Sequence, residues 1–222
     1  LGDCAEAPDA MDTVIADLLT IPEYITLFDD AFGGGINSVT KSNYAKAVAA
    51  FERTIVSTNS PYDKYIAGKL DALSDRQKSG LLLFHGKAGC VNCHSGPMYS
   101  DFSFHVLGAA DNAAHPGGTD NGANGLYLFR TPTLRNATLT GPYMHSGVYS
   151  TLTEVVEFMS SGVSENDNVP SGMLDAEFKS LGLNTVEIQD LVYFLESLTD
   201  EDFDRTPPAS VPSGLPVGGN IN

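Results

Sequence analysis

The stretch GLLLFHGKAGCVNCHSGP (residues 80–97) decides the fold, because it contains the pattern C-x-x-C-H at Cys90, Cys93 and His94. Two thiols at this spacing can each form a thioether with a vinyl group of haem, and the histidine that follows is the usual proximal ligand of the iron. A redox dithiol or half of a zinc site would use similar residues. The sequence shows neither a βαβ pattern nor a second ligand pair at comparable spacing, so it predicts one covalently bound haem c.

Helical periodicity dominates the sequence on both sides of the motif, and strand-like alternation is scarce. This pattern predicts an all-α fold with long loops. Three helix starts carry a capping box, in which the cap side chain and a Glu or Gln three residues later each bond the other residue's backbone amide. These pairs are Ser74 with Gln77, Thr151 with Glu154, and Asn184 with Glu187.

Three further helices are predicted before the motif, near residues 11–19, 22–32 and 40–56. The third has apolar residues at helical spacing, which predicts one stripe facing a core. The stripe consists of Tyr44, Ala47, Val48, Phe51 and Ile55.

The segment 95–147 is rich in Gly, Asn, Asp and Pro and has no sustained period. Such a long loop inside a compact domain is normally functional, and a haem would give its apolar residues a surface to pack on. We expect a helical segment at 1–57, a cytochrome c-type haem domain at 58–200, and an extended Pro/Gly-rich tail at 201–222.

The sixth ligand of the iron decides between electron transfer and ligand activation, because methionine closes the site and raises the potential. Met98 is too near His94 in sequence to reach the other face of a haem, and Met173 lies in a polar loop. Met144 and Met159 both remain candidates, and either side chain could equally fill a gap in the core.

The formal net charge is −16, with 28 acidic and 12 basic side chains. Nucleic acid and anionic membrane surfaces are therefore poor partners, and a basic protein or a small cation is a good one. No apolar run approaches the roughly 18 residues that span a bilayer, and the first residues lack the features of a signal peptide. Cys4 is expected to be a free thiol, with a bond to a partner as the alternative.

Four segments, at residues 50–68, 80–97, 129–147 and 151–159, resemble bacterial di-haem cytochrome c peroxidases. The related enzyme that matures methylamine dehydrogenase belongs to the same family, and the resemblance extends over roughly 9–199. It implies a class I cytochrome c-like domain whose long loops wrap the haem. It also implies Met159 over Met144 as the sixth ligand, where the maturation enzyme has tyrosine.

The resemblance implies further site residues, each of which also has a purely structural explanation. Arg130 and Arg135 would pair with haem propionates, for which the forked guanidinium is suited. Thr140, Gly141 and Pro142 match a stretch whose backbone carbonyls bind calcium in the peroxidases. His145 would order the loop around the haem. The remaining histidines, His85, His105 and His115, are expected to be structural.

The family normally has two C-x-x-C-H motifs and a tryptophan between the haems, whereas this sequence has one motif and no tryptophan. The peroxide-reacting haem, and with it any catalytic residue, is therefore expected outside these residues, on a longer form of the chain or on a separate one.

We expect an electron-transfer domain that accepts electrons from a cytochrome c or a small copper protein and passes them to a second haem, which reduces hydrogen peroxide. The alternative is a stand-alone mono-haem carrier or relay subunit. Substrate oxidation or protein maturation would need an open or tyrosine-ligated iron, which Met159 argues against. Because c-type haem is attached outside the bacterial cytoplasm, we expect a periplasmic protein, and an oligomer is compatible with this role.

Overall fold

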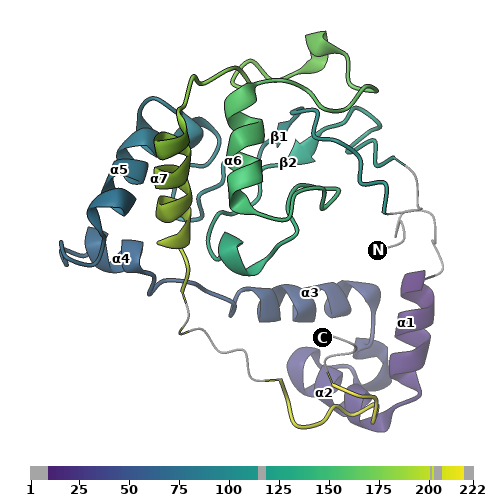
Figure 1. Cartoon of the computed structure of the whole chain (residues 1–222). Helices are drawn as coiled ribbons and strands as arrows, with labels where there is room; N and C mark the ends of the chain where they lie inside the picture. Colours follow the sequence, from purple (N-terminus) through teal and green to yellow (C-terminus); the bar gives the residue numbers. More distant parts are fainter. Residues whose placement is uncertain (1–9, 115–118, 201, 203–206, 218–222) are drawn as a thin grey trace. The chain divides into compact units, whose positions relative to one another are not determined.

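The computed structural model describes residues 10–114, 119–200, 202 and 207–217 (Figure 1). The described residues are mostly helical or irregular, which confirms the predicted α-helical fold. The helices are α1 (Ala10–Leu19), α2 (Pro22–Phe32), α3 (Lys41–Glu52), α4 (Pro61–Ile66), α5 (Asp75–His85), α6 (Leu152–Ser161) and α7 (Thr185–Glu196). Single 3₁₀ turns lie at Gly35–Ser38, Cys90–Asn92, Ala137–Leu139 and Ser171–Met173.

Two short antiparallel strands, β1 (Phe104–His105) and β2 (Phe129–Arg130), lie within the long loop segment. Phe104 pairs with Arg130, and His105 pairs with Phe129. Two residues are too few to show alternation in a sequence, so this ribbon was not predicted.

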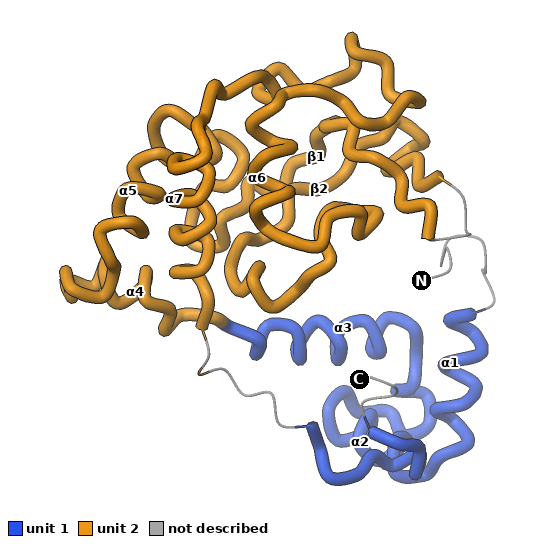
Figure 2. The backbone as a smooth tube through the Cα atoms, viewed as in Figure 1, with its two compact units in different colours: residues 1–56, 203–222 blue, residues 57–202 orange. Residues whose placement is uncertain are grey.

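The chain divides into two compact units (Figure 2). One comprises residues 57–202 and contains the C-x-x-C-H motif. The other comprises residues 1–56 together with 203–222. In the tail, residues 207–217 form neither helix nor strand.

The packing of α5 against α7 organises the unit formed by residues 57–202 (Figure 1). A Cβ atom at Gly80 would lie 1.9 Å from the carbonyl oxygen of Asp190, so only glycine permits this close approach of the two helices. The Arg76 guanidinium pairs with the Asp190 carboxylate and lies over the Tyr193 ring at 5.2 Å. The charge of the buried Asp190 is thereby compensated.

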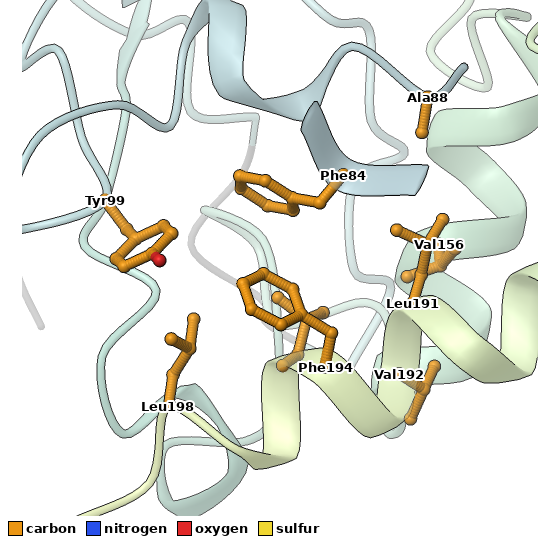
Figure 3. Packing of buried hydrophobic residues seen from close by; sticks show 9 residues of the cluster. Phe84, Ala88, Tyr99, Val156, Leu191, Val192, Phe194 and Leu198 are labelled. Atoms are coloured by element: carbon orange, nitrogen blue, oxygen red, sulfur yellow. The ribbon is translucent and has the colours of Figure 1, made fainter. Parts of the chain in front are cut away.

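A cluster of aromatic and aliphatic side chains lies beside this crossing (Figure 3). The Phe84 ring centroid is 5.0 Å from that of Phe194 and 5.7 Å from that of Tyr99, in tilted and edge-on arrangements. Such geometries add about 0.5–1.5 kcal/mol per pair beyond area burial. The cluster also contains Ala88, Val156, Leu191, Val192, Leu195 and Leu198.

All three predicted capping boxes are confirmed, at the starts of α5, α6 and α7. A fourth box starts α4, where Ser60 and Asp63 bond reciprocally. Sequence reasoning missed it because the third helical residue is Asp rather than Glu or Gln. Pro61 follows this cap as the first residue of the helix, a position at which the backbone N–H that proline lacks would have no partner within the helix.

The prediction that the apolar stripe of α3 faces a core is wrong for the described residues. No residue of α3 is buried, and Phe51 and Ile55 are 65% and 57% exposed. The helix also ends at Glu52, before Ile55. A period of 3.6 residues defines which face is apolar, but it does not define what that face packs on.

Candidate functional site

The C-x-x-C-H residues occupy one short turn that follows α5. Helix α5 ends at His85 and is capped by Gly86, and Gly89, with φ of +64°, redirects the chain into the 3₁₀ turn Cys90–Asn92. The backbone N–H of His94 donates to the carbonyl of Cys90 at 2.9 Å. This single turn holds the two thiols and the imidazole close together.

The proton of the His94 imidazole is positioned by a backbone carbonyl. Nδ1 lies 2.9 Å from the carbonyl oxygen of Tyr99, which fixes Nδ1 as the donor and leaves the lone pair on Nε2. Burial lowers the pKa of His94, although the Tyr99 carbonyl opposes this shift. His94 is therefore neutral near pH 7, the form in which imidazole ligates a metal.

The two thiols do not resemble a redox dithiol. Burial raises the pKa of Cys90 to about 11. Burial and then the carboxylates of Asp101, Asp175 and Glu177 raise the pKa of Cys93. Reactive cysteines in C-x-x-C redox motifs have lowered pKa values, so the raised pKa values of Cys90 and Cys93 argue against a redox dithiol.

Both methionine candidates for the sixth ligand pack on one apolar cluster, which we call the methionine cluster. Its buried members are Ala109, Phe158 and Phe178, and partly buried Leu107, Met144, Tyr149, Met159 and Leu174 pack against them. Met159 is on α6, and Met144 is on a loop with φ of +66°. Met144 and Met159 therefore lie in the same cluster, and the packing does not indicate which of the two would be the sixth ligand. Met98 and Met173, which the sequence analysis rejected as sixth ligands, are exposed.

The two arginines differ in their contacts. Arg135 forms a two-pronged ion pair with Asp63, both N–O distances being 2.9 Å, and its Nε donates to the carbonyl of Pro97 at 2.6 Å. Its guanidinium is thus committed to protein groups. Arg130 is exposed and lies over the Phe102 ring at 4.7 Å, and within the described part of the chain its N–H groups have no hydrogen-bond partner.

His145 contains a buried polar atom without a partner. Its ring stacks on Phe129 with centroids 3.7 Å apart, and Nε2 bonds to none of the described residues. Burial lowers the pKa of His145. An orphaned buried nitrogen costs free energy, and an acceptor such as a carboxylate of a bound cofactor would satisfy it.

Thr140 and Pro142, the residues expected near calcium, lie exposed just after the 3₁₀ turn Ala137–Leu139. The Thr140 hydroxyl donates to the carbonyl of Ala137 at 3.1 Å. Cys4 and His115 lie outside the described residues.

The interaction of His105 with Asp101 and Asp175, which lies beside the motif, was not predicted from the sequence. His105 Nδ1 lies 2.6 Å from Asp175, and Nε2 lies 3.1 Å from Asp101. The Cys93 sulfur is within 4.8 Å of the polar atoms of Asp101 and His105. Asp175 is 70 residues from His105, and no spacing rule connects residues so far apart.

A family model described as di-haem cytochrome c peroxidase matches residues 3–71. The chain is 36% identical to the cytochrome-c peroxidase IdrP1 of Denitromonas iodatirespirans over 88% of this chain and 62% of that protein. It is 35% identical to the methylamine utilization protein MauG of Methylorubrum extorquens over 91% and 58%, respectively. It is 32% identical to the cytochrome c551 peroxidase of Nitrosomonas europaea over 95% and 59%. The chain thus spans about three fifths of the length of these relatives.

Solved structures give a consistent fold. A MauG-like protein associated with microbial copper homeostasis superimposes with a TM-score of 0.68 at 26% identity, over 87% of this chain and 63% of that one. The di-haem peroxidase BthA of Burkholderia thailandensis superimposes with a TM-score of 0.66 at 22% identity, over 80% and 56%, which concerns the fold alone. Among the described residues, no helix has the length and apolar character that crossing a bilayer requires.

Proposed function

Because the chain belongs to the di-haem cytochrome c peroxidase family, we propose that residues 57–202 are an electron-transfer domain carrying one haem c. Cys90 and Cys93 would hold the haem through thioethers, and His94 Nε2 would be the proximal ligand. Met159 would be the sixth ligand, with Met144 as the competing candidate. When bound, the haem supplies a one-electron redox centre.

The observation that carries this proposal is the hydrogen bond between His94 Nδ1 and the Tyr99 carbonyl. Iron-ligating histidines characteristically donate their other ring nitrogen to such a carbonyl, which fixes the ring orientation and increases the basicity of the ligating nitrogen. Tyr99 is in turn fixed by its ring contacts with Phe84 and Tyr62. The methionine cluster would surround the sixth ligand with apolar side chains.

The polar residues take supporting roles in this proposal. His145 Nε2 would be a donor for a haem propionate, because it is buried and has no partner among the described residues. Arg130 has N–H groups available for the same purpose, whereas Arg135 would hold the loop through Asp63. Calcium at the carbonyls of Thr140 and Pro142 stays a prediction.

The partners follow from the family and the charge. A reduced cytochrome c or small copper protein would donate electrons, and complementary charge between a basic donor and this acidic chain would speed their encounter. Hydrogen peroxide, reduced at a second haem on another domain or chain, would take up two electrons supplied by the donor protein and two protons from solvent and yield two water molecules. The site of action would be the periplasm.

The sixth ligand is tested by substituting Met159 with alanine in the haem-loaded protein. The weak near-infrared sulfur-to-iron band of the oxidised protein should disappear, because the sulfur ligand is lost. Met144→Ala is the matched control, since Met144 packs on the same cluster. A band that survives in Met159→Ala and disappears in Met144→Ala would assign the ligand to Met144 instead.

A further inference from the structure

His105 connects two segments that lie far apart in the sequence. Both of its ring nitrogens face carboxylates, Asp175 at 2.6 Å and Asp101 at 3.1 Å. A ring that donates from both nitrogens is an imidazolium, so it balances two like charges that would otherwise repel each other. The imidazole is about four fifths buried, its side chain being 18% exposed.

Asp101 joins His105 to the haem-attachment motif. The backbone N–H of Asp101 donates to the carbonyl of Cys93 at 2.8 Å. Its carboxylate also accepts from the backbone N–H of Ser103 at 2.9 Å. Asp101 is therefore fixed next to Cys93, and Cys93 directly precedes His94 in the sequence.

Asp175 joins His105 to the turn at residues 174–178. Its backbone N–H donates to the carbonyl of Val106 at 2.9 Å, and its carboxylate accepts from the N–H of Glu177 at 2.9 Å. Glu177 in turn accepts from the Asn92 side chain at 2.8 Å. Asn92 lies between the two cysteines of the motif, so two independent contacts connect this turn with the motif.

The same turn packs on the methionine cluster. Phe178 is buried with its ring centroid 5.0 Å from that of Phe158, which directly precedes Met159 on α6. Leu174, at the other end of the turn, contacts the cluster as well. One short turn thus contacts the segment of the proximal histidine on one side and, on the other, the cluster that contains the candidate sixth ligands.

We propose that His105 is a positioning residue, which holds the turn at 174–178 between the haem-attachment motif and the methionine cluster and so sets the place of the methionine ligand relative to His94. The inference rests on the proposed function, because it concerns how the proposed haem ligands are held. It assigns His105 a role beyond filling the core.

The same atoms do not form a metal site once haem is attached. Cys93, Asp101 and His105 offer three donor atoms within 4.8 Å of one another. A thioether formed by Cys93 no longer provides the thiolate that such a site would need. With haem attached, the negative charges of Asp101 and Asp175 would be compensated by the imidazolium of His105.

The test compares His105→Gln with His85→Gln in the haem-loaded protein, because His85 is an exposed histidine of α5 outside this network. The first readout is the concentration of added imidazole that halves the near-infrared sulfur-to-iron band of the oxidised protein at pH 7, because imidazole occupies the iron only where the sulfur ligand has left. Loss of hydrogen bonds to charged partners should raise the population without the sulfur ligand, and so lower this concentration, at least about tenfold in His105→Gln. The concentration for His85→Gln should equal that of the wild type. Equal concentrations in the two variants would overturn the proposal.

The second readout is hydrogen exchange of the Asp175 amide, whose acceptor is the Val106 carbonyl. His105→Gln should accelerate this exchange at least about tenfold relative to His85→Gln, and equal rates would also overturn the proposal. If His105→Gln accumulates without haem, Asp175→Asn replaces it, because asparagine retains an acceptor for His105 but removes the charge. A wild-type protein that lacks the band would instead count against the proposed methionine ligand, and the exchange rates would still decide the role of His105.

Discussion

Replacing Gly80 by alanine should destabilise the unit formed by residues 57–202. The added Cβ would lie 1.9 Å from the Asp190 carbonyl oxygen and 2.8 Å from the Phe194 Cβ, so α7 would have to move by at least about 1 Å. Overpacking of a core typically costs about 1–3 kcal/mol, and a clash with backbone belongs at the upper end. Alanine recovers about 1 kcal/mol of helix propensity. The net loss should be about 2 kcal/mol.

Thermal unfolding followed by circular dichroism measures this effect. A loss of about 2 kcal/mol should lower the Tm by about 4–8 °C in a domain of this size. Ser79→Ala is the matched control, because Ser79 is the exposed neighbour of Gly80 on α5. The control should be neutral or slightly stabilising. If Gly80→Ala were as stable as Ser79→Ala, the close contact between α5 and α7 would be refuted.

Three further outcomes are expected. Thr151→Ala should lower the urea midpoint by the equivalent of about 1 kcal/mol, because α6 loses its cap, whereas Thr151→Ser should retain it. Arg135→Met should cost about 3–5 kcal/mol in urea unfolding by leaving the largely buried Asp63 carboxylate without its cation, and the double variant with Asp63→Asn, which keeps an acceptor for Ser60 in the capping box of α4, should recover most of this loss. The ion pairs with Asp175 and Asp101 raise the pKa of His105, so their stabilisation is fully present below pH 6.5 and is lost as the pH rises through the raised pKa. His105→Gln should abolish this slope in urea titrations, and an unchanged slope would contradict the assignment.

The sequence predicted those parts of the fold that depend on local chemistry. The capping pairs at Ser74, Thr151 and Asn184 act within three residues, and all three start helices as expected. The stripe on α3 depended on a partner surface that no local pattern contains, and none of its residues is buried. The two-residue strands β1 and β2 depend on contacts across a long loop, which has no period to read.

The candidate site divides in the same way. Cys90, Cys93 and His94 were predicted as haem-attachment residues because that chemistry fixes their spacing, and this assignment stays a prediction. The carbonyl that orients His94 belongs to Tyr99, in an irregular loop where the φ of +51° is unusual for a residue with a side chain. The pairing of His105 with Asp175 spans 70 residues and could emerge only from the folded chain.

Covalent attachment of haem is the central claim, and mass spectrometry of the denatured protein tests it directly. Trypsin cleavage after Lys87 and Arg130 releases residues 88–130, which contain both cysteines of the motif and no other cysteine. In protein made by cells that mature c-type cytochromes, this peptide should have the mass of the polypeptide plus one haem and should retain haem absorbance. An unmodified peptide with two free thiols would contradict the account.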